Sequence, residues 1–325
     1  DSIIVNEIWW NSLARHSDII LPANTSIEKN DIGIRHWDQT ISPMHKIIDP
    51  IGESKSDYEI FSEISAKLNF KEKFTENRNE DQWLRCMWEE AKEGAKESGF
   101  NLPEFDKFWK NGFQEVLSPK KQTILLEEFI KDPIKNSIST PSGKIEIFSE
   151  TLESFNYKDC PGHPIWLEQD EWLGSPLTKQ YPLQLISGQP YNRLHSQLDN
   201  GSESQKDKIS GREAVKIHPQ DALTRKLKDG DIVEIFNKRG RCLAGVVISK
   251  EVMKGVVFLP VGAWYDPIED GGFCVHGNPN VLTADIGTSS LSQGPSAHST
   301  LVEVKKFMKE LPPINILDKP NIVNK

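Results

Sequence analysis

Residues 232–249 read IVEIFNKRGRCLAGVVIS, and this stretch decides the fold that we expect for the second half of the chain. Two apolar, β-branched runs of strand length flank NKRG at 237–240, which is a hairpin-type turn sequence. Further runs of this kind are PLQLISG (182–188), AVKIH (214–218) and GVVFLPVGAW (255–264). Strands this dense, with one short helix expected at HPQDALTRKL (218–227), predict a small closed β-barrel.

The first half of the chain has a different pattern of expected elements, with helices between and after the strands. SIIVNE (2–7) reads as a buried strand, and a second apolar run at Ile19–Leu21 is stopped by Pro22. Strand, crossover and strand in quick succession predict an α/β unit. A helix is expected to begin after an N-cap at Ser56 or Asp57, and another to span residues 79–99, ending at Gly99.

Composition limits the classes of function. The chain has 325 residues, which is long enough for two domains. Its net charge of −9 argues against a nucleic-acid partner. Its four cysteines lie far apart with no C-x-x-C spacing, so neither a zinc nor an iron–sulfur site is expected. We expect no membrane span, because no apolar run approaches the required length. Because the chain starts at Asp1 inside a strand pattern, we interpret it as the C-terminal part of a longer protein.

Four polar clusters occur in the second half. Each combines small residues, which allow close backbone approach, with side chains of fixed hydrogen-bonding geometry. They favour a buried polar ring ligand, such as a pterin or a purine, over a catalytic triad. The clusters are SGQPYNRLHSQ (187–197), GAWYDP (262–267), HGNPNVLT (276–283) and GTSSLSQG (287–294).

Together with ARHSDIILPANTSIEKNDI (14–32) and PIGESKSDYEIFSEISAKL (50–68), these clusters carry a family resemblance. From about residue 3 to 306 the chain resembles the C-terminal region of the molybdenum-dependent S- and N-oxide reductases. This family includes the dimethyl sulfoxide, trimethylamine N-oxide and biotin sulfoxide reductases.

The resemblance implies a bis(molybdopterin guanine dinucleotide) molybdenum cofactor and a fold class. That class is an α/β segment, the end of a Rossmann-like domain, followed by a double-psi β-barrel. Residues 1–160 would be the C-terminal part of the α/β guanine-dinucleotide-binding domain, and 161–181, rich in Pro and Gly, a connection. Residues 182–310 would form the molybdopterin dinucleotide-binding barrel, and 311–325 the C-terminal tail.

The resemblance also assigns cofactor-binding residues. It places Asn6, Lys29 and Asp57 beside the guanine dinucleotide, and an Asp suits guanine because N1–H and N2–H₂ are neighbouring donors. Lys29 stands where relatives often have Arg, and Gln189 where relatives carry His. The loop residues Arg193, His195, Ser196 and Gln197 would contact the pterin and its phosphates. Further pterin-side contacts would come from Ser187, Gln189, Asn278, Asn280 and Gln293.

Several of these residues also have a plain structural interpretation. His195 could be a structural histidine, Asp57 only a helix cap and Lys29 only surface charge. Asn278 and Asn280 could be turn formers around Pro279. We expect Trp264 and Tyr265 to pack in the core, and Cys274 to be structural rather than a metal ligand.

The resemblance implies the reduction of a small S-oxide or N-oxide by oxygen-atom transfer, with a cytochrome as a candidate electron donor. No catalytic residue and no metal ligand is assigned, because the family's molybdenum-ligand serine would lie upstream, so the fragment alone is expected to be inactive. A free-standing barrel that binds a nucleotide or a protein is the alternative, and another molybdopterin enzyme, such as a formate dehydrogenase or nitrate reductase, is a third. Relatives that act on small methylated oxides are periplasmic enzymes of anaerobic respiration, whereas the biotin sulfoxide type is cytoplasmic.

Overall fold

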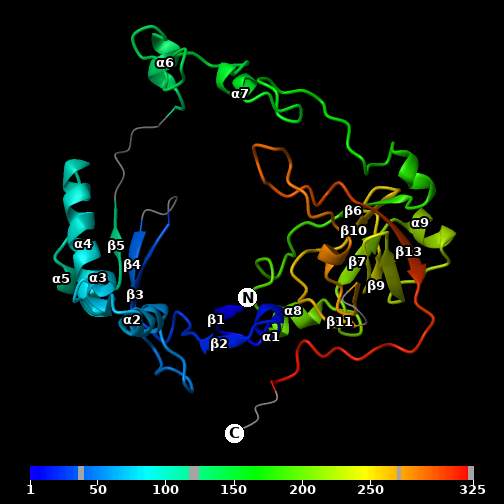
Figure 1. The fold of residues 1–325 in the computed structure, drawn as a ribbon, viewed down its shortest axis with the longest axis horizontal. Helices are drawn as coiled ribbons and strands as arrows, with labels where there is room; N and C mark the ends of the chain where they lie inside the picture. The colour runs from blue at the N-terminus through cyan, green and yellow to red at the C-terminus, as the bar shows by residue number, and fades with distance from the viewer. Residues whose placement is uncertain (36–39, 117–123, 269–271, 321–325) are drawn as a thin grey trace. The chain divides into compact units, whose positions relative to one another are not determined.

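The computed structural model describes residues 1–35, 40–116, 124–268 and 272–320. The chain divides into two compact units, Asp1–Glu127 and Glu128–Lys325, and each is described by itself (Figure 1).

The first unit begins with the predicted α/β element. Strand β1 (Ile4–Glu7) pairs in parallel with β2 (Ile19–Pro22), and the short helix α1 (Ser12–Arg15) connects them. The register places Ile4 opposite Ile19. The strand–crossover–strand pattern is therefore confirmed.

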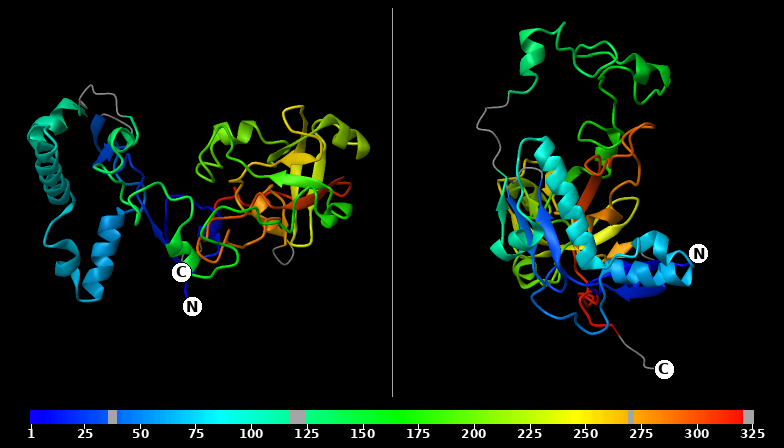
Figure 2. Two further views of the ribbon diagram at one scale, coloured as in Figure 1. Left: turned by 90° about the horizontal axis from the view of Figure 1, so that it is seen from above. Right: turned by 90° about the vertical axis from the view of Figure 1, so that its left-hand side faces the viewer.

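The rest of the first unit packs helices on a small antiparallel sheet. The sheet runs β3 (Asp31–Ile34), β4 (Thr40–Met44), β5 (Gln114–Glu115). Trp88 and Phe108 stack in its core with ring centroids 3.8 Å apart, and the buried side chain of Ile41 joins them from β4. The helices are α2 (Asp57–Lys67), α3 (Lys71–Thr75), α4 (Glu80–Glu97), which is the long cyan helix in Figure 2, and α5 (Phe105–Asn111).

Both predicted helix starts are found. The Ser56 hydroxyl accepts from the Glu59 backbone N–H, and the Glu59 carboxylate accepts from the Ser56 N–H, so Ser56 is the N-cap of α2 in a capping box. Asp57 is the first helical residue, which leaves its carboxylate available for other contacts. Asn79 caps α4 in the same way.

The second unit contains the predicted barrel. Six strands follow the order β9-β7-β10-β6-β13-β8, and β8 pairs back to β9 to close the ring as a mixed barrel. The predicted double-psi β-barrel fold class is thereby confirmed. The strands are β6 (Leu183–Ile186), β7 (Ala214–Ile217), β8 (Ile232–Phe236), β9 (Arg241–Ile248), β10 (Val256–Phe258) and β13 (Leu301–Lys306).

Shorter elements accompany the barrel. Strand β12 extends the sheet beyond β9, and β11 pairs with β12. Helix α9 is the predicted one, with His218 as its N-cap and Pro219 in its first turn. Their bounds, with those of the other short elements, are β11 (Pro267–Ile268), β12 (Phe273–Cys274), α6 (Glu127–Lys131), α7 (Glu150–Ser154), η1 (Pro176–Lys179), α8 (Ser202–Lys206), α9 (Pro219–Thr224) and η2 (Pro279–Val281).

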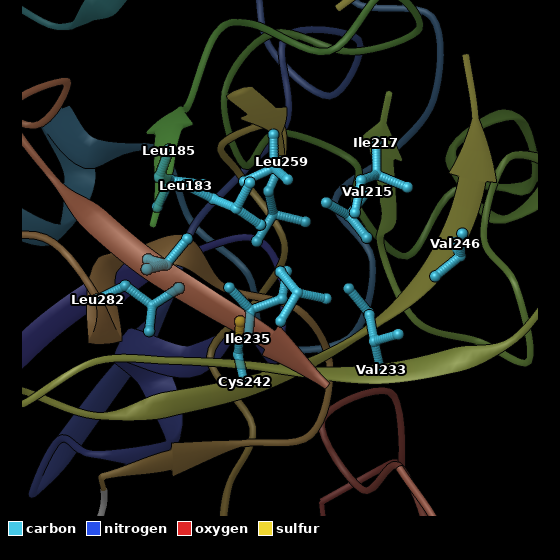
Figure 3. Close-up of a cluster of buried hydrophobic side chains, with 14 of the residues drawn as sticks. Leu183, Leu185, Val215, Ile217, Val233, Ile235, Cys242, Val246, Leu259 and Leu282 are labelled. Atoms are coloured by element: carbon cyan, nitrogen blue, oxygen red, sulfur yellow. The ribbon is translucent and has the colours of Figure 1, made fainter. Parts of the chain in front are cut away.

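Residues 232–249, the stretch that predicted the barrel, contain the hairpin β8–β9 (Figure 3). Its register places Ile235 opposite Cys242 and Val233 opposite Ala244, and these fully buried side chains fill the barrel. Cys274 lies in the same core, which agrees with the structural role expected for it. Leu243, between two inward-facing residues, belongs to a separate cluster with Phe273 and Val275. The two faces of β9 therefore belong to two different clusters.

The connection before the barrel is fastened to it. The Glu171 carboxylate accepts two hydrogen bonds from the Arg239 guanidinium, one of 2.9 Å to Nη2, and a third from the Leu301 backbone N–H. In the part of the chain that the structure describes, no helix combines the length and apolar character needed to cross a membrane. Nor do these residues include a group of three or more His, Cys, Asp or Glu side chains arranged to hold a metal ion.

Candidate functional site

Two of the three residues predicted on the guanine side lie together. The Asn6 side-chain amide on β1 donates to the Asp57 carboxylate at the start of α2, over 3.2 Å. Asp57 is exposed, and Ser56 rather than Asp57 caps the helix. The pair therefore presents a carboxylate at the first turn of a helix, oriented by an amide, and able to accept from a donor-rich edge.

Lys29, the third residue predicted on the guanine side, lines a pocket, and among the contacts that the structure describes it has none with Asn6 or Asp57. Its ammonium group is 3.7 Å from the Asp31 carboxylate, and the residue lines a pocket of about 370 Å³ with Tyr58 and Trp83. The loop before it is ordered by Glu28, a residue that the sequence did not single out. Glu28 accepts from the Thr25 hydroxyl and from the backbone N–H groups of Thr25 and Ile51, and these bonds lower its pKa to about 2.

The loop 187–197 presents an exposed polar edge at its tip. The Gln189 side-chain carbonyl accepts from the His195 backbone N–H over 3.1 Å, and the Gln189 amide nitrogen lies 2.8 Å from His195 Nδ1. His195 has a positive φ of 49°, a backbone conformation that is uncommon for residues other than glycine and occurs in tight turns. His195, Ser196 and Gln197 are all exposed, so the structure places three predicted binding residues side by side on one accessible segment.

Arg193 from the same loop is buried instead. Its side chain is 2% exposed, and its Nη2 lies 2.7 Å from the Glu213 carboxylate and 3.2 Å from the Val261 carbonyl oxygen. Ser187, at the end of β6, is buried as well, and among the described residues its hydroxyl has no hydrogen-bond partner.

Three of the four predicted polar clusters contact one another. The Trp264 indole N–H donates to the Ser196 carbonyl over 2.8 Å, which joins the second cluster to the first. Gly262, at φ 99°, lies so close to the His195 carbonyl that a Cβ would fall 1.8 Å from the oxygen. The Asn278 side-chain amide donates to the Ala263 carbonyl, which joins the third cluster to the second.

The remaining predicted residues are placed differently. Asn278 also caps η2, because its side-chain oxygen accepts from the Asn280 backbone N–H, so the turn-forming interpretation holds beside the proposed ligand contact. Asn280 is exposed. In the fourth cluster, Gln293 donates to the Ser289 carbonyl of its own loop, and Asp159 accepts from Ser290.

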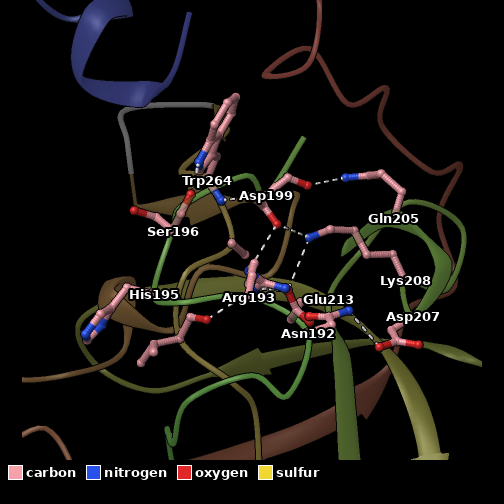
Figure 4. A network of polar contacts seen from close by, with 12 residues as sticks. Asn192, Arg193, His195, Ser196, Asp199, Gln205, Asp207, Lys208, Glu213 and Trp264 are labelled. Carbon is pink, nitrogen blue, oxygen red and sulfur yellow. Dashed lines mark hydrogen bonds and ion pairs between the residues drawn. The ribbon is translucent and has the colours of Figure 1, made fainter. Parts of the chain in front are cut away.

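Sequence reasoning assigned no role to the buried titratable residues next to these loops, although His276 lies in the third predicted cluster. Asp199, Lys208, Glu213 and His276 are all buried, and Figure 4 shows the first three around Arg193. Burial, with Lys208 close by, lowers the pKa of His276 to about 4, so its ring is neutral at pH 7. The signal in the sequence was the presence of Glu213 next to an apolar strand and of His276 at the end of another.

Fold and geometry thus define a barrel whose polar loops meet over a buried ion cluster, an arrangement suited to a polar ring ligand. Comparison with known proteins agrees. Residues 183–301 match the family model of the molydopterin dinucleotide binding domain, and residues 1–67 match that of the molybdopterin oxidoreductases.

Proteins of known function are similar in sequence to this chain over most of its length. The trimethylamine-N-oxide reductase of Haemophilus influenzae is 42% identical over 332 residues, which is 99% of this chain and 40% of that protein. The dimethyl sulfoxide/trimethylamine N-oxide reductase of Rhodobacter capsulatus is 41% identical over 94% of this chain and 38% of its own length. Among solved structures, acetylene hydratase from Pelobacter acetylenicus superposes with a TM-score of 0.67 at 19% identity, covering 94% of this chain and 40% of that one, which supports the fold alone.

The chain therefore carries a molybdopterin dinucleotide-binding domain and a segment of the molybdopterin oxidoreductase domain. It is a relative of the molybdopterin-dependent S- and N-oxide reductases, as the sequence motifs predicted. It spans about two fifths of the length of the curated relatives that it matches.

Proposed function

We propose that this chain is the cofactor-binding C-terminal portion of a molybdenum oxidoreductase that reduces a small S-oxide or N-oxide. The observation that carries the proposal is the meeting of three loops, 187–197, 262–264 and 276–280, within the span that matches the dinucleotide-binding domain. The identity of about 42% to trimethylamine-N-oxide reductase over nearly the whole chain favours this function over a barrel without a redox role.

The residues present fit bis(molybdopterin guanine dinucleotide) molybdenum. A pterin offers ring nitrogens, a carbonyl and an amino group, and the exposed His195, Ser196 and Gln197 supply donors and acceptors for them. The Ser187 hydroxyl is buried and has no partner among the described residues, so its predicted contact with the pterin, like that of Arg193, is not explained by an exposed side chain. The remaining pterin-side contacts would come from Gln189, Asn278, Asn280 and Gln293.

On the guanine side, Asp57 would accept from the base while Asn6 holds the carboxylate in place. Lys29 would supply a positive charge for a phosphate. Arg193 is the predicted contact that direct binding explains least well, because its guanidinium is buried.

When bound, this cofactor supplies the redox chemistry of oxygen-atom transfer, with two electrons and two protons releasing the oxygen as water. The residues of this chain would bind and orient it. They would hold it through directional hydrogen bonds, and the close approach of Gly262 to the His195 carbonyl would keep the binding loop in place. No proton transfer and no metal ligation is assigned to them.

The domain organisation follows the same proposal. Residues 1–160 would complete a guanine-dinucleotide-binding domain, with 161–181 as the connection, 182–310 as the barrel and 311–325 as the tail. We further propose a cytochrome as electron donor and the periplasm as compartment, as in relatives that act on small methylated oxides; the cytoplasm is the alternative.

Turnover by the full-length gene product that contains this chain tests the function. The protein would be expressed with molybdate and given reduced viologen with trimethylamine N-oxide, dimethyl sulfoxide or biotin sulfoxide in turn. The expected result is viologen oxidation with at least one of the oxides. Protein prepared from cells starved of molybdate should show no such activity. A protein loaded with molybdenum that reduces none of the three oxides would contradict the proposed reaction.

A further inference from the structure

Four charged side chains meet beneath the pterin-side loops, shielded from solvent (Figure 4). Lys208 Nζ lies 2.8 Å from Asp199 Oδ1 and 3.2 Å from Glu213 Oε2. Arg193 Nη2 lies 2.7 Å from the same Glu213 oxygen, and Arg193 Nε lies 3.6 Å from Asp199 Oδ1. Their side chains are between 0% and 4% exposed, and two positive charges balance two negative ones.

A buried ion cluster is poor evidence for a stabilising role. Removing four charges from water costs about as much as their attraction returns, and apolar side chains of similar volume often serve stability as well. What such a cluster provides is a fixed geometry, because each buried charge requires an opposite charge close by. Among the described residues, Arg193 Nε and Asp199 Oδ1 form an ion pair with each other, and Asp199 Oδ1 forms another with Lys208, but neither atom has a hydrogen bond.

The geometry that this cluster fixes is that of the loops. Asp199 accepts from the Trp264 backbone N–H over 2.8 Å, and Arg193 donates to the Val261 carbonyl over 3.2 Å. Trp264 in turn holds Ser196. Three hydrogen bonds therefore tie the segment that carries His195 to residues 261–264, and two of them come from the cluster itself.

We propose that Arg193 and Glu213 are positioning residues for the cofactor-binding loop. Arg193 acts on the cofactor through the backbone of residues 195–197, and its guanidinium does not bind a phosphate. This inference rests on the proposed function, because it concerns how the same loop holds the pterin.

Neutralising Glu213 distinguishes between two roles for Arg193, direct binding of a phosphate and positioning of the loop. If the guanidinium bound phosphate directly, Glu213→Gln would remove a competing anion and slow the release of the cofactor. If the guanidinium positions the loop, the same change loosens it and speeds release. Arg193→Lys adds a second distinction, because a lysine still binds phosphate but has one nitrogen, so it cannot place one nitrogen at Glu213 and another at Asp199 as Nη2 and Nε do.

The experiment follows the release of guanine nucleotide from the loaded full-length protein during dilution and gel filtration. Positioning predicts release at least fivefold faster in both Glu213→Gln and Arg193→Lys. The control is Glu303→Gln, which breaks the ion pair of 2.7 Å with Arg225 between β13 and the end of α9 and so perturbs the barrel away from these loops. It should lower the thermal midpoint while release stays at the wild-type rate.

Slower or unchanged release in Glu213→Gln, at a thermal midpoint close to wild type, would overturn the inference. Should Glu213→Gln fold poorly, the charge-balanced pair Glu213→Gln with Lys208→Met retains Arg193 and Asp199, and the same criterion applies to it. A wild-type protein that holds neither molybdenum nor guanine nucleotide would contradict the proposed function itself. A wild type that holds both, with variants that release it no faster, would contradict this inference alone.

Discussion

His276 Nδ1 lies 2.9 Å from the carbonyl oxygen of Trp264. Since a carbonyl can only accept, Nδ1 must carry the hydrogen, and Nε2 is left as a bare acceptor. Among the described residues this buried nitrogen has no hydrogen-bond partner. The ring is therefore held in one neutral tautomer, with Lys208 and Arg193 nearby to oppose its protonation and Asp199 to favour it.

This relationship predicts a pH dependence of stability. Burial lowers the pKa of His276 from the ordinary 6.5 to about 4 in the folded protein. Between these pH values the unfolded chain binds a proton at His276 that the folded protein does not bind. The contribution of the neutral His276 ring to stability is therefore fully present above pH 6.5 and is lost as the pH falls towards 4. The loss should reach roughly 3 kcal/mol in the free energy of unfolding.

Unfolding of wild type and His276→Asn by urea between pH 7 and pH 4 measures the effect. The variant should lose less stability on acidification than the wild type, because asparagine has no proton to bind. Identical pH profiles for the two proteins would show that His276 does not titrate in this range.

Gly262→Ala should displace the binding loop. The new Cβ would fall 1.8 Å from the His195 carbonyl oxygen, so one of the two segments must move. We expect a loss of roughly 3 kcal/mol of stability and weaker nucleotide retention. Gly230→Ala is the matched control, because that glycine also has a positive φ, of 82°, but no atom within 4 Å of the added Cβ. It should cost about 1 kcal/mol and leave nucleotide content unchanged; equal effects of both changes would mean that the contact with His195 is unimportant.

Ser56 and Asp57 allow helix capping to be separated from guanine binding. Ser56→Ala removes the N-cap of α2 and should cost about 1 kcal/mol of stability without loss of bound guanine nucleotide. Asp57→Ala should lower the guanine nucleotide content while the helix keeps its cap. Calorimetry and nucleotide analysis of the same two preparations provide the comparison. Full nucleotide content in Asp57→Ala would reduce Asp57 to a helix-start residue.

Trp264→Phe should loosen the link between two of the loops. The change keeps most of the buried ring but removes the indole N–H that donates to the Ser196 carbonyl. A cost of about 1 kcal/mol in stability is expected, together with faster proteolysis within residues 192–200. An unchanged cleavage rate would show that this hydrogen bond does not order the loop.

Local patterns predicted most of the barrel. The hairpin β8–β9 follows from two apolar, β-branched runs around a turn sequence, and the caps at Ser56 and Asn79 follow from side chains beside the helices that they begin. These features depend on neighbours in the sequence, so the sequence displays them directly.

The surroundings of the site depend on distant residues. Nothing near Arg193 in the sequence reveals that Glu213 and Val261 would bury its guanidinium, or that Trp264 would reach Ser196. In the same way, the fastening of Ser290 to Asp159 joins residues 131 positions apart. The role of each predicted ligand therefore stays a prediction, although its place in the fold is now defined.

The most direct test counts cofactor in the loaded full-length protein. Molybdenum and released guanine nucleotide would be quantified per chain in wild type and in a variant with both His195→Ala and Asp57→Ala. The account predicts one molybdenum and two guanine nucleotides per wild-type chain, with both falling sharply in the variant while its thermal midpoint changes little. A wild type that lacks both, or a double variant that retains them fully, would contradict the claim that these loops hold the cofactor.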